Sequence, residues 1–267
     1  MDEPRRLVLL GHPVSHSLSP AFQNAALRAA GISLHYEALD VQPDALAAML
    51  ASLAADRAIG NVTIPHKEAV AARCARRTPL AERVGAVNTF WHEHGELVGD
   101  NSDVGGAEVV MRALAGTALA GGDVALIGAG GSAAAVVVAA ERCGVRQVRV
   151  YNRSVDRAVQ LASRFPSIVV PSDSMASALS GVHLVVNATP IGLEDSSFPV
   201  PLDALPPESA VFDLAYTRGE TAWVTAARSA GHRAADGEGM LIEQGAISFE
   251  RWFGLSPDRN AMWKAIH

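Results

Sequence analysis

This chain has few cysteines and few aromatic residues, and its net charge is negative. Its two cysteines, Cys74 and Cys143, lie far apart in sequence, so we expect buried thiols of a protein in the reducing cytoplasm rather than a disulfide framework. The formal net charge of −6 gives no basic field to hold a polyanion, and we therefore expect no nucleic-acid partner. An anionic small molecule would need a few local cations instead.

Long apolar runs are also missing. The longest, residues 133–140, cannot span a bilayer, and the run at residues 7–10 is too short for the core of a signal peptide. We therefore predict a soluble, cytoplasmic protein that does not associate with membranes. No metal is expected either, because His12, His16 and His66 lack the carboxylate or thiol companions that a metal site needs.

Strand-like and helix-like patterns alternate along the chain and predict an α/β protein with parallel sheets and helical crossovers. The abundance of alanine suits closely packed helices. The expected extended segments are residues 7–10, 34–39, 61–64, 84–88, 89–91, 96–98, 124–127, 148–151, 168–170, 184–187 and 210–214. The expected helices include residues 20–30, 43–55, 65–75, 104–115 and 220–230.

The spacing of these segments predicts two domains. The regular strands of residues 124–214, separated by helices, fit a doubly wound sheet. After the loop at residues 236–239 comes a long helical tail, which we expect to return to the first domain. The prediction is an N-terminal α/β substrate domain, residues 1–103 plus 237–267, completed by the C-terminal helices, and a Rossmann-like doubly wound NADP domain, residues 104–236.

A glycine turn follows the apolar strand that begins this second domain. The strand gives way to Gly128, Ala129, Gly130, Gly131 and Ser132, and then to small helix-forming residues. This order lets the chain turn sharply and bring a helix N-terminus against a pyrophosphate. In such a turn the first glycine permits the tight bend and the second permits close approach of the backbone. The pattern predicts dinucleotide binding.

The end of the following strand, residues 147–151, indicates which dinucleotide is bound. Enzymes that use NAD usually present a carboxylate there to the ribose 2′-hydroxyl. This chain instead presents Asn152, Arg153 and Ser154, with Arg157 one turn later. Guanidinium groups suit a phosphate, which indicates NADP. Solvated charges at a helix start are the alternative, but their position after the glycine turn favours cofactor binding.

Polar clusters in the first hundred residues predict a substrate site. Ser17 and Ser19 precede a helix and can aim together at a carboxylate, although capping of that helix would also explain Ser19. Asn61 and Thr63 alternate with apolar residues, so we expect them on one strand face. Lys67 begins the next predicted helix and could exchange a proton, although a lone lysine is more often a solvated surface group.

Asn88 and Asp103 add amide and carboxylate groups to this set. Asp103 precedes a predicted helix, so N-capping is its simplest role. Together the two side chains could instead bind vicinal hydroxyls of a polyol, because they offer complementary donors and acceptors.

These motifs, taken in order, resemble the shikimate dehydrogenase family, the NADP-linked enzymes that interconvert 3-dehydroshikimate and shikimate. The matching segments are Ser17-Leu18-Ser19-Pro20, Asn61-Val62-Thr63-Ile64-Pro65 with Lys67, Gly85-Ala86-Val87-Asn88-Thr89, Asp100-Asn101-Ser102-Asp103, the turn Gly128 to Gly131, Asn152-Arg153-Ser154, Asn187-Ala188-Thr189 with Gly192, and Gly239-Met240-Leu241 with Gln244. The resemblance spans nearly the whole chain. It implies reversible NADPH-dependent reduction of 3-dehydroshikimate in aromatic amino acid biosynthesis.

The resemblance also implies a role for each site residue. Lys67 would transfer the proton, with Asp103 beside it. The substrate would be held by Ser17 and Ser19 at its carboxylate, by Thr63, Asn88, Asp103 and Gln244 at its ring hydroxyls, with Asn61 in the same motif and Tyr216 nearby. The cofactor would be held by the glycine turn and Thr189, by Asn152, Arg153, Ser154 and Arg157 around its 2′-phosphate, and by Gly239 beside the nicotinamide.

Some positions depart from the family pattern and keep alternatives open. His66 stands where phenylalanine is common, Ser102 replaces the usual threonine, and Gln23 replaces a frequent histidine. A turn of Thr217-Arg218-Gly219 follows Tyr216 where Asn-Pro is common. A quinate or aminoshikimate dehydrogenase of the same fold therefore remains an alternative. A folate-linked dehydrogenase and a non-catalytic NADPH-binding regulator are further ones, and a homodimer is left open.

Overall fold

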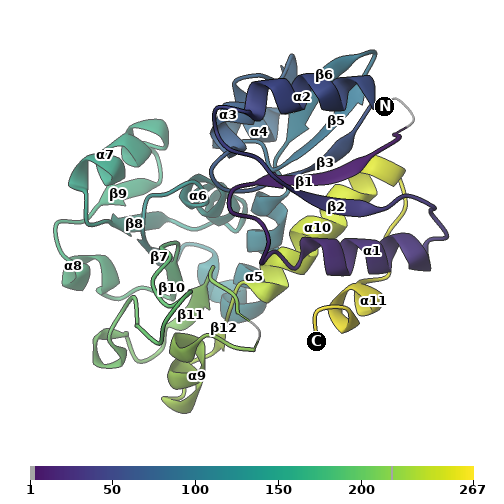
Figure 1. Ribbon diagram of the computed structural model, residues 1–267. Coiled ribbons are helices and arrows are strands. Elements are labelled where there is room, and N and C mark those ends of the chain that lie inside the picture. Colours follow the sequence, from purple (N-terminus) through teal and green to yellow (C-terminus); the bar gives the residue numbers. More distant parts are fainter. Residues whose placement is uncertain (1–3, 218) are drawn as a thin grey trace. The chain divides into compact units, whose positions relative to one another are not determined.

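The computed structural model describes residues 4–217 and 219–267, and the chain divides into two compact units (Figure 1). Unit 1 comprises Met1–Asp103 together with Leu241–His267, and unit 2 comprises Val104–Met240. Each unit is built around its own six-stranded sheet. This architecture confirms the predicted α/β fold class with two domains.

The sheet of unit 1 is mixed, whereas the sequence predicts parallel pairing throughout. Its strands, in spatial order, are β2 (Tyr36–Asp40), β1 (Leu7–Gly11), β3 (Ile59–Val62), β5 (Thr89–Glu93), β6 (Glu96–Asp100) and β4 (Arg76–Arg77). The pairs β1–β2, β1–β3 and β4–β6 are parallel, but β3–β5 and β5–β6 are antiparallel. Only His94 and Gly95, both with positive φ, link β5 to β6. Such a link makes a hairpin and is too short for a parallel crossover.

The helices of unit 1 correct two expectations. They are α1 (Ser19–Ala29), α2 (Leu46–Ala55), α3 (Lys67–Ala71), α4 (Pro79–Val84), most of α10 (Glu238–Phe253) and α11 (Arg259–Lys264). Residues 84–88 are not extended as predicted, because α4 ends at Val84, with Gly85 left-handed at φ 71°. Ser19 does not cap α1 but is its first residue, and its N–H donates to Ser17 Oγ over 3.2 Å.

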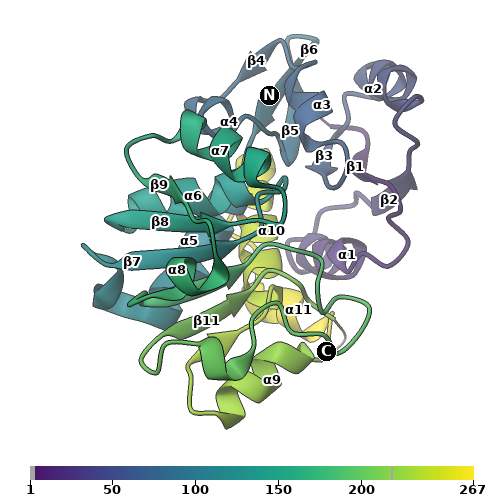
Figure 2. The same cartoon turned by 90° about the vertical axis from the view of Figure 1, so that its left-hand side faces the viewer.

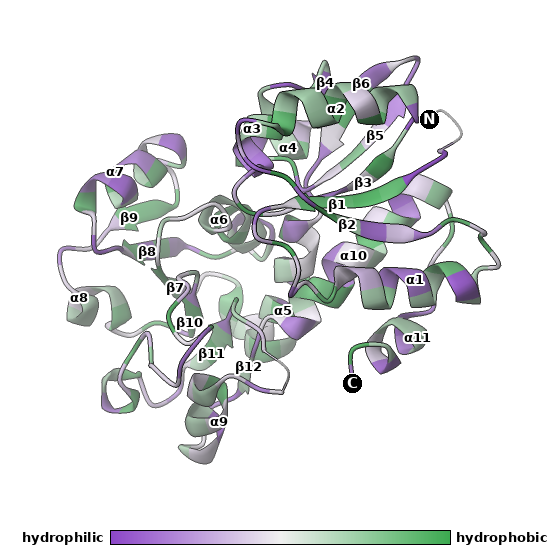
Figure 3. Ribbon diagram, in the orientation of Figure 1, coloured by the Kyte–Doolittle hydropathy of each residue, from purple (hydrophilic) through white to green (hydrophobic). Residues whose placement is uncertain are grey.

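Two apolar layers cover the faces of the unit 1 sheet. Alternate residues of β1 face opposite layers, and the strand is hydrophobic along its length (Figure 3). One layer includes Phe22 of α1 with Phe249 of α10 and Met262 of α11. The other includes Leu46, Leu50 and Leu53 of α2. The C-terminal helices therefore complete the core of a unit that begins at the other end of the chain.

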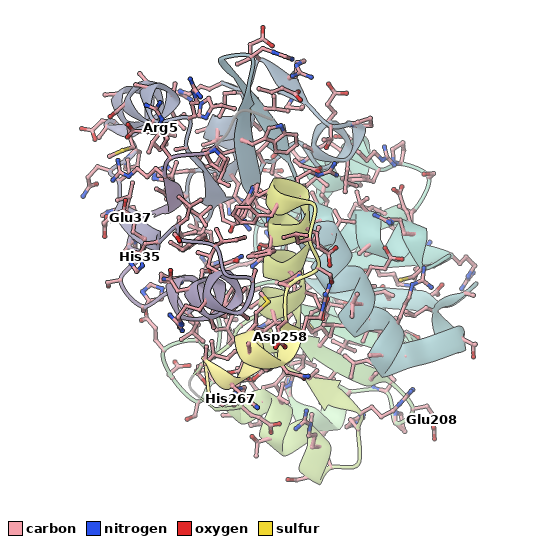
Figure 4. The ribbon with its side chains drawn as sticks, turned by 90° about the vertical axis from the view of Figure 1, so that its right-hand side faces the viewer. Arg5, His35, Glu37, Glu208, Asp258 and His267 are labelled. Atoms are coloured by element: carbon pink, nitrogen blue, oxygen red, sulfur yellow. The ribbon has the colours of Figure 1, made fainter. Side chains whose placement is uncertain are left out.

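Asp258→Ala is expected to lower the free energy of unfolding by about 1 kcal/mol, the usual cost of losing an N-cap. Asp258 lies on the link between α10 and α11 (Figure 4). Its Oδ1 accepts a hydrogen bond from Ala261 N at 3.1 Å, which fixes the start of α11. The cap thereby helps to place Met262 in the apolar core. Urea denaturation measures the loss. Asp258→Asn retains an acceptor and should keep most of the stability; an equal loss in both variants would contradict the capping role.

The sheet of unit 2 is parallel throughout. Its order is β12 (Ala234–Ala235), β11 (Ala210–Asp213), β10 (Leu184–Asn187), β7 (Asp123–Ile127), β8 (Gln147–Tyr151) and β9 (Val169–Pro171), and β7 to β9 lie side by side in Figure 2. This is the doubly wound order of a dinucleotide-binding sheet. The predicted strands are confirmed, and β12 joins them. Its two residues are too few to give a strand pattern in the sequence.

Helices connect these strands and leave a topological switch point between β7 and β10. The connecting helices are α6 (Ala133–Arg142), α7 (Val155–Arg164), α8 (Met175–Leu179) and α9 (Ala222–Ser229). A 3-10 turn, Leu202–Ala204, lies between β10 and β11, and α5 (Asp103–Ala115) with the 3-10 turn Gly116–Leu119 leads into β7. In doubly wound sheets, ligands bind outside the carboxyl ends of the strands at such a point. Among the residues described, no helix is long and apolar enough to cross a membrane.

Candidate active site

A lysine and a carboxylate from separate elements meet in unit 1. Lys67 is the first residue of α3, and Asp103 follows β6. Lys67 Nζ lies 2.6 Å from Asp103 Oδ2, and the side chains are only 14% and 7% exposed. A cation at the start of a helix opposes the helix dipole, so α3 itself gains nothing from this lysine. The pair places a proton donor against a fixed acceptor.

Asn88 fixes the other oxygen of Asp103. The backbone N–H of Ser102 donates to Asn88 Oδ1 at 2.7 Å, which identifies that atom as the amide oxygen. Asn88 Nδ2 therefore faces Asp103 and donates to Oδ1 at 2.8 Å. Both oxygens of Asp103 thus accept hydrogen bonds from the protein, one from Asn88 and one from Lys67. The carboxylate is held in one orientation.

Gln244 of α10 adds an amide to the same group. Its Nε2 donates to Leu241 O at 2.7 Å, so its Oε1 is the atom that faces Asn88 Nδ2 at 3.3 Å. The second N–H of Gln244 has no partner in the part of the chain that the structure describes. Gln244 is thereby oriented by the protein and retains a donor for a ligand hydroxyl.

Asn61 lies beneath this group rather than within reach of solvent. It is 5% exposed, and its Oδ1 accepts from Tyr36 Oη at 2.9 Å. Its Nδ2 donates to Asn88 O at 3.1 Å and to Ser248 Oγ at 2.9 Å. Every donor on this amide is engaged with the protein, which suits support of Asn88 better than direct contact with a ligand.

Ser17, Ser19 and Thr63 lie in loops at the carboxyl ends of β1 and β3 or at the start of α1. Ser17 Oγ accepts from Ser19 N and keeps its own proton for another acceptor. Thr63 is partly exposed and directly follows β3, so it does not extend the strand face of Asn61 as predicted. A Cβ on Gly11 would lie 2.4 Å from Thr63 Cγ2, so the glycine makes room for this threonine. Within the described ranges, none of the three hydroxyls is hydrogen-bonded to the Lys67–Asp103 pair.

The three glycines of the turn in unit 2 are not all required for the same reason. Gly128 has φ +106°, and a Cβ there would lie 2.9 Å from Ala188 O, so this position requires glycine. A Cβ on Gly130 would meet only Ala188 O, at 4.0 Å, and one on Gly131 would meet nothing within 4 Å. Packing within the protein therefore does not explain Gly130 and Gly131, whereas close approach of a ligand to the backbone would.

No side chain among the described residues caps the first turn of α6. Ser132 occupies the N-cap position with helical dihedral angles, and its side chain makes no capping hydrogen bond. The initial N–H groups of a helix lack intrahelical partners and carry the positive end of its dipole. Ala133 N donates to Gly130 O at 3.0 Å, and the other N–H groups of this turn, which no described side chain caps, suit a phosphate.

The residues predicted to bind the 2′-phosphate follow β8, and they differ in whether the protein already engages their side chains. Asn152 Oδ1 accepts from Ala129 N at 3.1 Å, and its Nδ2 donates to Ser154 O at 2.8 Å. Asn152 therefore braces the glycine turn. Arg153 and Arg157 are exposed, and neither forms an ion pair among the residues described. Ser154 occupies the N-cap position of α7 without a side-chain cap. The two guanidinium groups and the Ser154 hydroxyl remain available to a phosphate.

Thr189 is held by a buried network that sequence reasoning missed. Its N and Oγ1 donate to Asn187 Oδ1 at 2.9 and 2.7 Å, and Asn187 Nδ2 donates to Asp213 Oδ1 at 2.8 Å. Thr221 Oγ1 donates to Asp213 Oδ2 at 2.9 Å, and burial raises the pKa of Asp213. In the sequence, the signal for this network is that the apolar strands β10 and β11 each end in a polar residue, Asn187 and Asp213. The network fixes the loop after β10 beside Gly128.

The start of α10 lies close to the loop after β11. A Cβ on Gly237 would lie 2.3 Å from Leu214 O, so only glycine fits. A Cβ on Gly239 would lie 3.2 Å from Val110 Cγ2, which is a tight fit. Tyr216 is partly buried in the same loop. Among the described residues, no group of three or more His, Cys, Asp or Glu side chains could hold a metal ion.

Asp236, just before α10, is a buried carboxylate with one unsatisfied oxygen. Its Oδ1 accepts from Glu238 N at 3.1 Å, while Oδ2 has no partner among the described residues. Burial raises the pKa of Asp236 from 3.8 to about 6, and the charges of Glu238 and Asp213 add to the rise. The folded protein therefore retains a proton that the unfolded chain releases, so stability falls as pH rises from about 4 to about 6.

Asp236→Asn is expected to reduce this pH dependence, because the amide keeps the Oδ1 acceptor and cannot ionise. The free energy of unfolding, measured by urea denaturation across that pH range, should decline less in the variant than in the parent protein. Asp203→Asn, at an exposed carboxylate, is the control and should leave the slope unchanged. An identical slope in all three proteins would contradict the assignment to Asp236.

Comparison with known proteins identifies the family of this chain. Residues 9–90 match the profile of the shikimate dehydrogenase substrate binding domain, residues 110–192 that of shikimate / quinate 5-dehydrogenase, and residues 237–267 that of the shikimate 5′-dehydrogenase C-terminal domain. The chain belongs to the shikimate dehydrogenase family. The resemblance seen in the sequence motifs is thereby confirmed.

Relatives within the shikimate dehydrogenase family align along almost the whole chain. Shikimate dehydrogenase (NADP(+)) of Rubrobacter xylanophilus is 42% identical over 270 residues, covering 97% of this chain and 94% of that protein. The crystal structure of the Aquifex aeolicus enzyme has a TM-score of 0.93 at 30% identity, covering 100% and 99% of the two chains. Shikimate 5-dehydrogenase of Thermus thermophilus, in complex with NADP(H) and shikimate, has a TM-score of 0.88 at 38% identity, covering 98% of each chain.

Proposed function

We propose that this protein is an NADP-dependent shikimate dehydrogenase, which reversibly reduces 3-dehydroshikimate to shikimate in aromatic amino acid biosynthesis. The observation that carries the proposal is the Lys67–Asp103 pair, 2.6 Å apart and oriented by Asn88, in a chain of this family. We place the enzyme in the cytoplasm, since Cys74 and Cys143 are free thiols, which a reducing compartment preserves.

Unit 2 would hold the cofactor. The helix start after Gly130 and Gly131, which no described side chain caps, suits the pyrophosphate, and Arg153 with Arg157 suits the 2′-phosphate. Thr189, fixed by Asn187, would border the same switch point, and Gly239 and Tyr216 would lie toward the nicotinamide and the substrate. Bound NADPH supplies the hydride. Asn152 contributes by holding the glycine turn through Ala129 N.

Unit 1 would hold the substrate. The Ser17 and Ser19 hydroxyls would donate to the substrate carboxylate. Thr63, Asn88 and Gln244 would contact the ring hydroxyls, Gln244 through the N–H that the protein leaves unused. Asp103 would accept from the hydroxyl next to the reacting carbon, and Asn61 would support Asn88 from below. Polar groups fixed in this way give orientation, which lowers the barrier without taking part in bond changes.

Lys67 would supply the proton. Reduction adds a hydride to the carbonyl carbon, and the developing alkoxide takes a proton from the Lys67 ammonium. Asp103 holds that ammonium in line through its Oδ2, while Asn88 prevents the carboxylate from turning. In the oxidative direction the neutral amine takes the proton back. Electrons and protons therefore balance with one hydride and one proton per turnover.

Absorbance of NADPH during incubation with shikimate and NADP tests the proposal. We expect rapid NADPH formation, much slower formation of NADH with NAD, and a lower kcat/KM with quinate. The profile that matches residues 110–192 covers quinate enzymes too, so quinate is the second candidate. A higher kcat/KM with quinate than with shikimate would make quinate the preferred substrate. Cofactor binding without turnover of either would contradict dehydrogenase function and favour a regulator.

A further inference from the structure

A chain of buried polar side chains leads from the edge strand of the unit 1 sheet to Asp103. We call it the polar relay and define it as Tyr36, Asn61, Ser248, Ser102 and Asn88. The five come from β2, β3, α10 and the segments before α5 and β5, and none is more than 5% exposed. Such a network is costly unless every member is satisfied, so its donors and acceptors can be assigned by counting.

The two asparagines of the polar relay have only one consistent orientation each. Ser102 N donates to Asn88 Oδ1, so both hydrogens of Asn88 Nδ2 point the other way. They meet Asp103 Oδ1 at 2.8 Å and Ser102 Oγ at 2.9 Å. Asn61 Oδ1 accepts the Tyr36 hydroxyl, which leaves Nδ2 for Ser248 Oγ. Ser248 and Ser102 therefore each accept from an amide.

The direction of the link between the two serines follows from Ser248. Its single hydroxyl hydrogen goes to Gln244 O at 3.0 Å, one turn earlier in α10. It cannot also donate to Ser102 Oγ at 3.0 Å, so Ser102 donates to Ser248. The Ser102 oxygen is then left with its lone pairs toward Asn88 Nδ2. A serine that bonds back within its own helix slightly destabilises that helix, so α10 alone gives no reason for Ser248.

Without Ser248 the hydroxyl of Ser102 would have other acceptors. Asn88 Oδ1 lies 3.2 Å away and Gln244 Oε1 lies 3.5 Å away. Turning toward either would withdraw the Ser102 lone pair from Asn88 Nδ2 and alter the amide that orients Asp103. The effect would reach the Lys67–Asp103 pair although Ser248 touches neither residue.

We propose that Ser248 is a positioning residue, which sets the hydrogen-bond direction of the polar relay and so holds Asn88 and Asp103 in their reactive orientation. The inference rests on the proposed function for its kinetic consequence. Its structural consequence, the fixed environment of the Asn88 amide, does not depend on any substrate.

Kinetics of Ser248→Ala, alone and combined with Asp103→Asn, test the coupling. In the otherwise unchanged enzyme we expect kcat for shikimate to fall by about tenfold, a modest misplacement effect, with KM for NADP unchanged. In the Asp103→Asn background Ser248→Ala should change kcat by less than about twofold, because coupled residues are not additive. Equal losses in both backgrounds would overturn the inference.

The side-chain amide signals of Asn88 in a 15N–1H spectrum give a second readout, taken without substrate. Ser248→Ala should shift them, and Ser248→Thr, which keeps a hydroxyl, should restore them in whatever fraction folds. Asp258→Ala is the matched control, since it weakens α11 through Ala261 N and, among the residues that the structure describes, none of its hydrogen bonds involves the polar relay. It should leave the Asn88 signals in place.

The two readouts separate failure of the inference from failure of the proposed function. If the parent protein does not turn over shikimate or quinate, the proposed function fails, and the Asn88 signals still decide the role of Ser248. If turnover is normal but those signals do not move in Ser248→Ala, the relay direction is overturned. If the Asn88 signals shift by the same amount in Asp258→Ala, the effect of Ser248→Ala is one of general stability, which overturns the inference as well.

Discussion

Replacing Lys67 by alanine is expected to lower turnover of shikimate by about 100-fold or more, the range for lost acid–base help. The variant removes the proton donor and leaves Asp103 with Asn88 as its remaining partner. KM for NADP should change little, because the residues proposed to hold the cofactor belong to unit 2. Initial rates of NADPH formation, with substrate and cofactor varied separately, measure both parameters.

The variant Lys67→Arg distinguishes the role of Lys67 as a proton donor from its role as a positive charge. Arginine restores a cation opposite Asp103, but its guanidinium does not release a proton at neutral pH. We expect it to recover stability and leave turnover as low as in the alanine variant. Near-normal turnover in Lys67→Ala would remove the lysine from the mechanism. Recovery of turnover by arginine would mean that charge alone, rather than proton transfer, is required.

Replacing both Arg153 and Arg157 by alanine is expected to raise KM for NADP by about 10- to 100-fold, because two exposed guanidinium groups together would contribute about 1.5–3 kcal/mol to binding the 2′-phosphate. KM for NAD, which lacks the 2′-phosphate, should stay within about twofold, so the preference for NADP largely disappears. Neither arginine has an ion-pair partner among the residues described, so their loss breaks no internal salt bridge. Initial rates with each cofactor measure the change.

Arg164→Ala is the control for this pair. Arg164 lies in the last turn of α7, the helix whose first turn carries Arg157, and its guanidinium stacks over Phe165. Its removal changes the charge of the same helix without touching the end that would face a phosphate. If the double variant keeps its KM for NADP, Arg153 and Arg157 are surface charges. If the control raises that KM equally, the effect is one of overall charge.

The fold of unit 2 could be predicted because each of its signals is local. Short apolar strands end in glycine or polar residues and alternate with helices, so the parallel doubly wound sheet follows from spacing alone. Unit 1 was harder. The turn at His94 and Gly95 makes β5 and β6 an antiparallel hairpin, and α4 is too short to show a helical period. These elements depend on turns and caps more than on hydrophobic patterning.

The candidate site was predictable as a set of residue types, and its internal arrangement was not. Lys67 and Asp103 stood out as motif residues, and the structure brings them together. Asn61 fitted the same motif, yet its amide is engaged by Ser248, 187 positions later in the chain. A contact between two residues so far apart in sequence leaves no local pattern from which it could be predicted. The buried serines and Tyr36 therefore appear only when the chain is folded.

The division of the chain has a consequence for synthesis. Unit 2 is one continuous stretch, Val104–Met240, whereas the apolar layer of unit 1 needs Phe249 and Met262 from beyond it. On the ribosome the dinucleotide-binding module can mature first, while the N-terminal module waits for its last helices to emerge. Ser248 and Gln244 belong to that same later segment, so the hydrogen-bonded group around Asp103 is completed only after α10 has been made.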